Sequence, residues 1–273
     1  MFHRFSLTAS FLVAATALPA QTDRASELFD VLELGTVLEI MRDEGLGYGQ
    51  ELGEEMFPER VNADWTALVA RIYDLDTMIG EVERDFTQSL EGDDVDAMIA
   101  FFNEKPGSNF VDLEISARRA LMDDAVEEAS QDAAAIAMAD ETDRYRLVQD
   151  FVEANSLVDS NVVGALNANY AFYTGLIDGG ALGGDLTEDQ ILSDVWGQEP
   201  EIRQNTTEWI YSFLLMAYEP MSDEDLQAYI AFSQTPAGQQ LNEALFEGFD
   251  DVFEEISRAL GLAASQFMIG AEL

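Results

Sequence analysis

The sequence contains no cysteine, and histidine occurs once in its 273 residues, at His3. The lack of cysteine excludes disulfide bridges, thiolate nucleophiles and cysteine-ligated metal sites. A single histidine at the N-terminus also leaves no cluster of imidazoles for zinc and no Ser-His pair for nucleophilic catalysis. We therefore predict no catalytic residues of these types. The sequence leaves open whether the protein is an enzyme and favours a protein that is not one.

Basic residues are scarce: Lys105 is the only lysine, and lysine and arginine together number 13 against 54 acidic residues. The formal net charge of −41 repels phosphate backbones, so we expect no nucleic-acid partner. Paired carboxylates recur along the chain and predict weak cation association at an acidic surface. Neither a twelve-residue calcium loop nor a phosphate-binding glycine loop with a following lysine occurs. We predict no specific metal site and no cofactor.

Long apolar runs are absent except at the N-terminus. There, His3 and Arg4 precede a stretch over 5–18 that is apolar except for Ser and Thr, and small residues follow up to Ala20. This pattern is typical of a secretory signal peptide over 1–20 that is cleaved after Ala20. The stretch is short for a membrane span, which makes an uncleaved anchor the weaker alternative. We predict a periplasmic or secreted protein without a transmembrane segment after signal removal.

Apolar residues recur at steps of three and four through most of the chain. One series runs from Trp65 to Phe86, and another runs from Leu241 to Leu260. This period is that of one helical face, and Gly261 then predicts the end of the last helix. No strand-like alternation extends beyond a few residues. The predicted fold class is all-α.

Glycine and capping residues predict where helices end and begin. The glycine-rich stretches 45–49 and 178–185 predict interruptions, and the second must be a loop. Thr187 and Ser222 are each followed three residues later by Gln or Asp, the spacing of a capping box at a helix start.

The two halves of the chain resemble each other. Residues 94–107 and 225–238 share six identities in fourteen aligned positions. We therefore predict two tandem multi-helix units related by an internal repeat and packed side by side. The first, more degenerate unit covers 23–139, and the second covers 141–270 with the glycine-rich loop.

The clearest local motif is a corner between two helices in the second half. Pro236 ends the preceding helix, because the residue before a proline avoids the α region, and Pro236 is also favoured as the first residue of the next helix. Thr235 is the predicted N-cap. Gly238 lies in the first turn, where a missing side chain lets another helix come close, and Phe232 packs into the angle.

The first half contains a weaker version of this corner. Phe101, Pro106 and Gly107 correspond to the aromatic, proline and glycine of the second copy. The proline is displaced by one place, so that Lys105 takes the position of Pro236, and no threonine precedes it. We predict the same helix corner with a degraded cap.

The F-x-x-T-P-x-G pattern of Phe232, Thr235, Pro236 and Gly238 resembles the bacterial domain of unknown function family 2059. The resemblance covers 50–60 residues of the second half, and a weaker copy begins near Asp93. It implies an exported all-helical protein without an assigned activity, and it supplies no catalytic residues.

Aromatic residues gather at helical spacing around Trp209 and Phe213, where they form either core or a ligand groove. The function predicted from the sequence is a non-enzymatic binding or interaction protein of the cell envelope, whose partner is an envelope protein or an apolar ligand. The alternative is a carboxylate-based hydrolase acting on envelope polysaccharide. That activity requires a carboxyl group with a raised pKa in a cleft.

Overall fold

The computed structural model describes residues 18–90, 95–182 and 187–269, and within them every regular element is a helix, which confirms the all-α class. The helices are α1 (Leu18–Val31), α2 (Leu34–Met56), the 3₁₀ helix η1 (Pro58–Arg60), α3 (Ala63–Ile72), α4 (Leu75–Ser89), α5 (Val95–Asn103), α6 (Gly107–Ala120), α7 (Asp124–Ala139), α8 (Asp143–Ala154), α9 (Leu157–Asp178), α10 (Glu188–Gly197), α11 (Glu199–Tyr218), α12 (Asp223–Ser233) and α13 (Pro236–Ile269). Residues 1–17 of the predicted signal peptide and 183–185 of the predicted loop lie outside the described residues.

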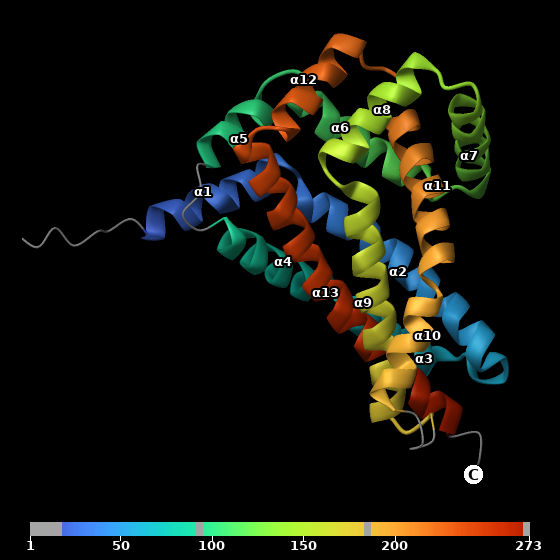
Figure 1. The fold of residues 1–273 in the computed structure, drawn as a ribbon. Helices are drawn as coiled ribbons and strands as arrows, with labels where there is room; N and C mark the ends of the chain where they lie inside the picture. The colour runs from blue at the N-terminus through green and yellow to red at the C-terminus, as the bar shows by residue number, and fades with distance from the viewer. Residues whose placement is uncertain (1–17, 91–94, 183–186, 270–273) are drawn as a thin grey trace, which may run out of the picture.

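The long helix α13 runs through the middle of the molecule, alongside α9 and across α4 (Figure 1). Gly261 lies inside this helix, so the predicted helix end at Gly261 is wrong. A Cβ atom at Gly261 would lie 2.1 Å from the carbonyl oxygen of Phe172, and one at Gly175 would lie 2.1 Å from that of Arg258. The glycines therefore let α9 and α13 pack backbone to backbone, and this packing outweighs the low helix propensity of glycine.

The predicted interruption at 45–49 is also wrong, because these residues belong to α2. Gly45 faces the ring of Tyr73, and Gly49 faces the side chain of Val69. A Cβ atom at either glycine would overlap these side chains, at 2.1 Å and 2.4 Å respectively. The glycines form a flat face on which α3 packs.

Other predicted boundaries are confirmed. The helix α9 ends before Gly179, and a break separates it from α10. Thr187 caps α10 in a full capping box with Gln190, and the hydroxyl of Ser222 accepts a hydrogen bond from the backbone N–H of Asp225 at the start of α12. The prediction of one helical face from Trp65 to Phe86 is wrong, because α3 ends at Ile72 and Asp74 caps the start of α4 with its side chain.

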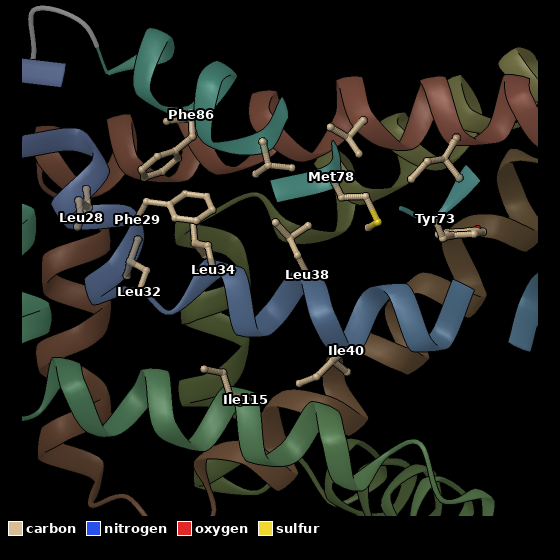
Figure 2. Close-up of a cluster of buried hydrophobic side chains, with 14 of the residues drawn as sticks. Leu28, Phe29, Leu32, Leu34, Leu38, Ile40, Tyr73, Met78, Phe86 and Ile115 are labelled. Atoms are coloured by element: carbon tan, nitrogen blue, oxygen red, sulfur yellow. The ribbon is translucent and has the colours of Figure 1, made fainter. Parts of the chain in front are cut away.

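The largest apolar core lies between α1, α2, α4 and α13. Figure 2 shows Leu34 and Leu38 of α2 directed toward Phe86 and Met78 of α4, while Ile40 on the opposite side of α2 points toward α6. Leucine, valine and isoleucine residues of α13 complete this core. The last helix of the second predicted unit thus contributes to the core around the first. No described helix is both long enough and apolar enough to cross a bilayer.

Candidate functional site

The corner between α12 and α13 is held by its threonine. The hydroxyl of Thr235 accepts a hydrogen bond from the backbone N–H of Gly238 at 3.1 Å and donates one to the carbonyl oxygen of Phe232 at 2.6 Å. Pro236 is the first residue of α13. Since the first N–H groups of a helix have no partner within the helix, Thr235 stabilises the start of α13.

The corner between α5 and α6 has the same close approach without the cap. Pro106 precedes α6, and no side chain caps that helix. A Cβ atom at Gly107 would lie 2.1 Å from the carbonyl oxygen of Phe101, and one at Gly238 would lie 2.2 Å from that of Phe232. Both glycines therefore occupy positions that exclude any side chain.

The two corners meet in the structure. The rings of Phe101 and Phe232 stack with their centroids 4.1 Å apart, and Phe102 packs edge-on against Phe232 at 5.5 Å. The internal repeat itself stays a prediction, but the residues that suggested it are brought together from both halves.

Two adjoining cavities lie beside this pair of corners. The smaller has a volume of about 250 Å³ and is bounded partly by Phe232 and Gly238, while the larger has a volume of about 380 Å³ and extends along α2 and α13. Both are partly open to the surface. They share lining side chains from α5, α6, α9, α11, α12 and α13, among them Phe102, Glu114, Leu157, Phe213, Tyr229 and Leu245.

Glu114 of α6 places a carboxyl group in the wall of both cavities. The hydroxyl of Tyr218 donates a hydrogen bond to its Oε1 at 2.6 Å, and Tyr229 also hydrogen-bonds to it. Burial disfavours the charged carboxylate and raises the pKa of Glu114 to about 7, although the two tyrosines act in the opposite direction. A carboxyl group that titrates near neutral pH is a typical feature of functional sites.

Arg118 lies one turn further along α6 and lines the same cavities. Its Nη2 and Nε lie 2.8 Å and 3.0 Å from the two carboxylate oxygens of Glu44, and its guanidinium lies 5.8 Å from the ring centroid of Trp209. A bidentate pair of this kind satisfies the charge of the guanidinium. Arg118 is therefore already committed to Glu44.

Asp250 of α13 lines the larger cavity from another side. Burial raises its pKa to about 6, and the neighbouring carboxylates of Glu254 and Asp251 add to the effect. The sequence suggested only weak cation association along this acidic stretch. In the structure, Asp250 is partly withdrawn from solvent, so that two carboxyl groups with raised pKa values line one cavity.

Several site residues escaped the sequence analysis. No sequence motif marks Glu114 or Tyr229, because Glu114 is one of 54 acidic residues and Tyr229 is one of eight tyrosines. The available signal was position: Glu114 lies on the same helical face as Phe110 and Ala117, which are buried. Around the described residues, no group of three or more His, Cys, Asp or Glu side chains is arranged to hold a metal ion.

Comparison with known proteins adds no relative. No protein-family model, curated protein or solved structure matches the chain. The resemblance to family 2059 stays a prediction that rests on the corner residues.

Proposed function

We propose that this protein is an exported, non-enzymatic binding protein that takes a small apolar ligand between its helices. The observation that carries the proposal is the pair of adjoining cavities, about 250 Å³ and 380 Å³, lined largely by aliphatic and aromatic side chains. Ligand sites in proteins are commonly clefts of about 300–1,000 Å³ with few polar groups, and the larger cavity falls within that range. Glu114 provides such a group here.

The alternative to a ligand site is a packing defect. Protein interiors are close-packed, and unfilled apolar space forfeits contacts. A carboxyl group in the wall of such space also loses hydration, which costs free energy unless a partner replaces the water. The partial opening of both cavities to the surface supplies a route for a ligand.

Export is supported by the sequence pattern that ends at Ala20. Expression of the full chain in a bacterial host should yield a periplasmic or secreted product whose first residue is Gln21. The intact mass and the N-terminal sequence of that product measure this directly. A product that retains the first 20 residues would contradict export with cleavage.

The binding function is tested by native mass spectrometry of the mature protein isolated from the envelope fraction of its own host. We expect an adduct that is released on denaturation and partitions into organic solvent. The matched control is Leu245→Trp, which places a larger side chain in the wall shared by both cavities. An adduct retained equally by this variant would place the ligand elsewhere, and an unliganded wild-type protein would count against the proposal.

A carboxylate-based hydrolase of envelope polysaccharide is the second candidate, and the raised pKa values favour it. Glu114, with a pKa of about 7, has the protonation behaviour of a general acid, and Asp250 lines the same cavity. The test is turnover of peptidoglycan and soluble glycans from pH 5 to 8. Activity lost in Glu114→Gln and kept in Asp112→Asn, an exposed acid on the same helix, would favour the hydrolase over the binding protein.

A further inference from the structure

We propose that the ligand carries a positively charged amino group that binds the carboxylate of Glu114 while its apolar part lies among the aromatic side chains of the cavity. This inference rests on the proposed binding function and specifies its ligand class. It follows from three features of the cavity wall: the acceptor capacity of Glu114, the rings around it and the charges that face it.

The first feature is the hydrogen bonding of Glu114. Tyr218 from α11 and Tyr229 from α12 are its donors in the structure. A carboxylate has about four acceptor positions, so two phenols leave capacity for a ligand that donates hydrogen bonds. The position of Glu114 in the walls of both cavities directs that capacity toward a ligand.

The second feature is the aromatic lining. Aromatic rings attract organic cations through the negative potential of their faces, and a cage of rings is a common site for ammonium groups. The rings that line the smaller cavity together with Glu114 are those of Phe102, Phe151, Trp209, Phe213, Tyr218, Tyr229 and Phe232. Of these, Trp209 already has the guanidinium of Arg118 5.8 Å from its ring centroid.

The third feature is the balance of charge. Among the described residues that line the two cavities, Arg118 is the only cationic side chain, and it is paired with Glu44. Burial, and next the carboxylate of Glu114, raise the pKa values of Tyr218 and Tyr229 well above the usual range, so both remain neutral donors.

The cavity therefore offers carboxyl groups without a free cation. Asp250 adds a second carboxyl group across the larger cavity. The net charge of −41 also attracts cations toward the molecule. An anionic ligand would be repelled by these carboxyl groups and by the net charge of the protein.

The probes are 2-phenylethylamine and 2-phenylethanol, which have the same apolar part and differ in charge. Their affinities are measured by isothermal titration calorimetry at pH 8 in 0.15 M NaCl. We expect the amine to bind at least about tenfold more tightly than the alcohol, because a charge-assisted hydrogen bond forms in a partly buried site. In Glu114→Gln, the two affinities should agree within about twofold, since the amide keeps the shape but not the charge.

Asp112→Asn is the matched control, because it removes an exposed carboxylate from the same helix. It should leave the amine-to-alcohol ratio unchanged, which separates pairing at Glu114 from general attraction to an acidic surface. Asp250→Asn should keep most of the ratio. A ratio that falls in Asp112→Asn or Asp250→Asn as much as in Glu114→Gln would overturn the assignment of the amino group to Glu114.

A second measurement uses the unaltered protein and does not depend on any variant folding. Between pH 8 and pH 5.5, protonation of Glu114, with its pKa of about 7, should lower the amine-to-alcohol ratio, while the affinity for the alcohol stays level. Asp250 also titrates in this window, and the Asp250→Asn variant reports its share. A ratio that does not change with pH would contradict the proposal.

The failures of the two proposals are distinguishable. If both probes bind equally well to the wild-type protein, the cavity binds apolar ligands but the amine class is wrong. If neither probe binds, the amine proposal fails together with the binding function on which it rests.

Discussion

The ring of Phe101 lies flat against the ring of Phe232, with the planes 7° from parallel and the centroids 4.1 Å apart. The two residues hold the same position in the two helix corners, one before Gly107 and the other before Gly238. The stack joins the end of α5 to the end of α12, and these helices lead into α6 and α13, which carry Glu114 and Asp250. The geometry of the cavity walls therefore depends on this contact.

The stacked pair should show energetic coupling. In a double-mutant cycle with Phe101→Leu and Phe232→Leu, we expect each single change to destabilise the fold, and we expect a coupling free energy of about 0.5–1.5 kcal/mol. The free energy of unfolding is measured by urea denaturation. The control pair is Phe101→Leu with Phe57→Leu, where Phe57 packs on Trp65 instead, and should be additive. Additivity in the first pair would show that the stacked rings of Phe101 and Phe232 do not stabilise each other.

Gly238 should tolerate no side chain. We expect Gly238→Leu to lower the free energy of unfolding by more than about 1 kcal/mol, because its Cβ would overlap the carbonyl oxygen of Phe232. Gly80→Ala in α4 is the control: nothing lies within 4 Å of its Cβ, so the change should stabilise by about 0.5–1 kcal/mol. Unchanged urea midpoints for Gly238→Leu would show that the corner has room for a side chain at this position.

The two corners should differ in their dependence on a cap. Thr235→Ala should lower the free energy of unfolding by about 1 kcal/mol, since it leaves the N–H of Gly238 without its acceptor. Glu104 aligns with Thr235 in the first corner, and no side chain caps α6 there. Glu104→Ala should therefore change stability by less than about 0.5 kcal/mol. Equal losses in thermal melts of the two variants would show that the capping bond is not the cause.

The stability difference between Glu114→Gln and the wild type should depend on pH. The pKa of Glu114 is raised from 4.5 to about 7 on folding, so between these values the folded state binds more protons than the unfolded state. Wild-type stability contributed by this group is thus present at low pH and lost as the pH rises through 7. We expect the variant to gain about 1–3 kcal/mol relative to the wild type between pH 4.5 and pH 7.5.

Urea denaturation at several pH values measures this difference. The contribution of Asp250 is present in both proteins and cancels to first order. The contribution of lost hydrogen bonds to the tyrosines is a constant offset. A difference that stays flat from pH 4.5 to pH 7.5 would show that Glu114 is not withdrawn from solvent.

Local sequence signals predicted much of the helical structure. Period and capping chemistry act within a few residues, and so Thr187 and Ser222 marked the starts of α10 and α12 correctly. The glycines at 45–49 and at Gly261 do not end a helix, because the local cost of glycine in a helix is small beside the gain from close helix packing. Which glycine packs against a neighbouring backbone is a property of the whole fold.

The candidate site could not be predicted from the sequence for a related reason. Glu114 and Tyr218 are 104 residues apart, and their hydrogen bond exists only because α6 packs against α11. Periodicity identifies the apolar face of each helix but not the partner of that face. The aromatic residues around Trp209 suggested either core or groove, and in the structure Trp209 lines the smaller cavity.

Titration with the uncharged fluorescent probe N-phenyl-1-naphthylamine measures whether the cavity between the helices binds an apolar ligand. We predict saturable fluorescence enhancement with the wild-type protein and at least about tenfold weaker binding to Leu245→Trp. Leu192→Trp makes the same change at an exposed position of α10 and should bind the probe like the wild type. Circular dichroism confirms that all three proteins are folded. Absent binding, or equal binding to Leu245→Trp, would show that this cavity is not an apolar ligand site.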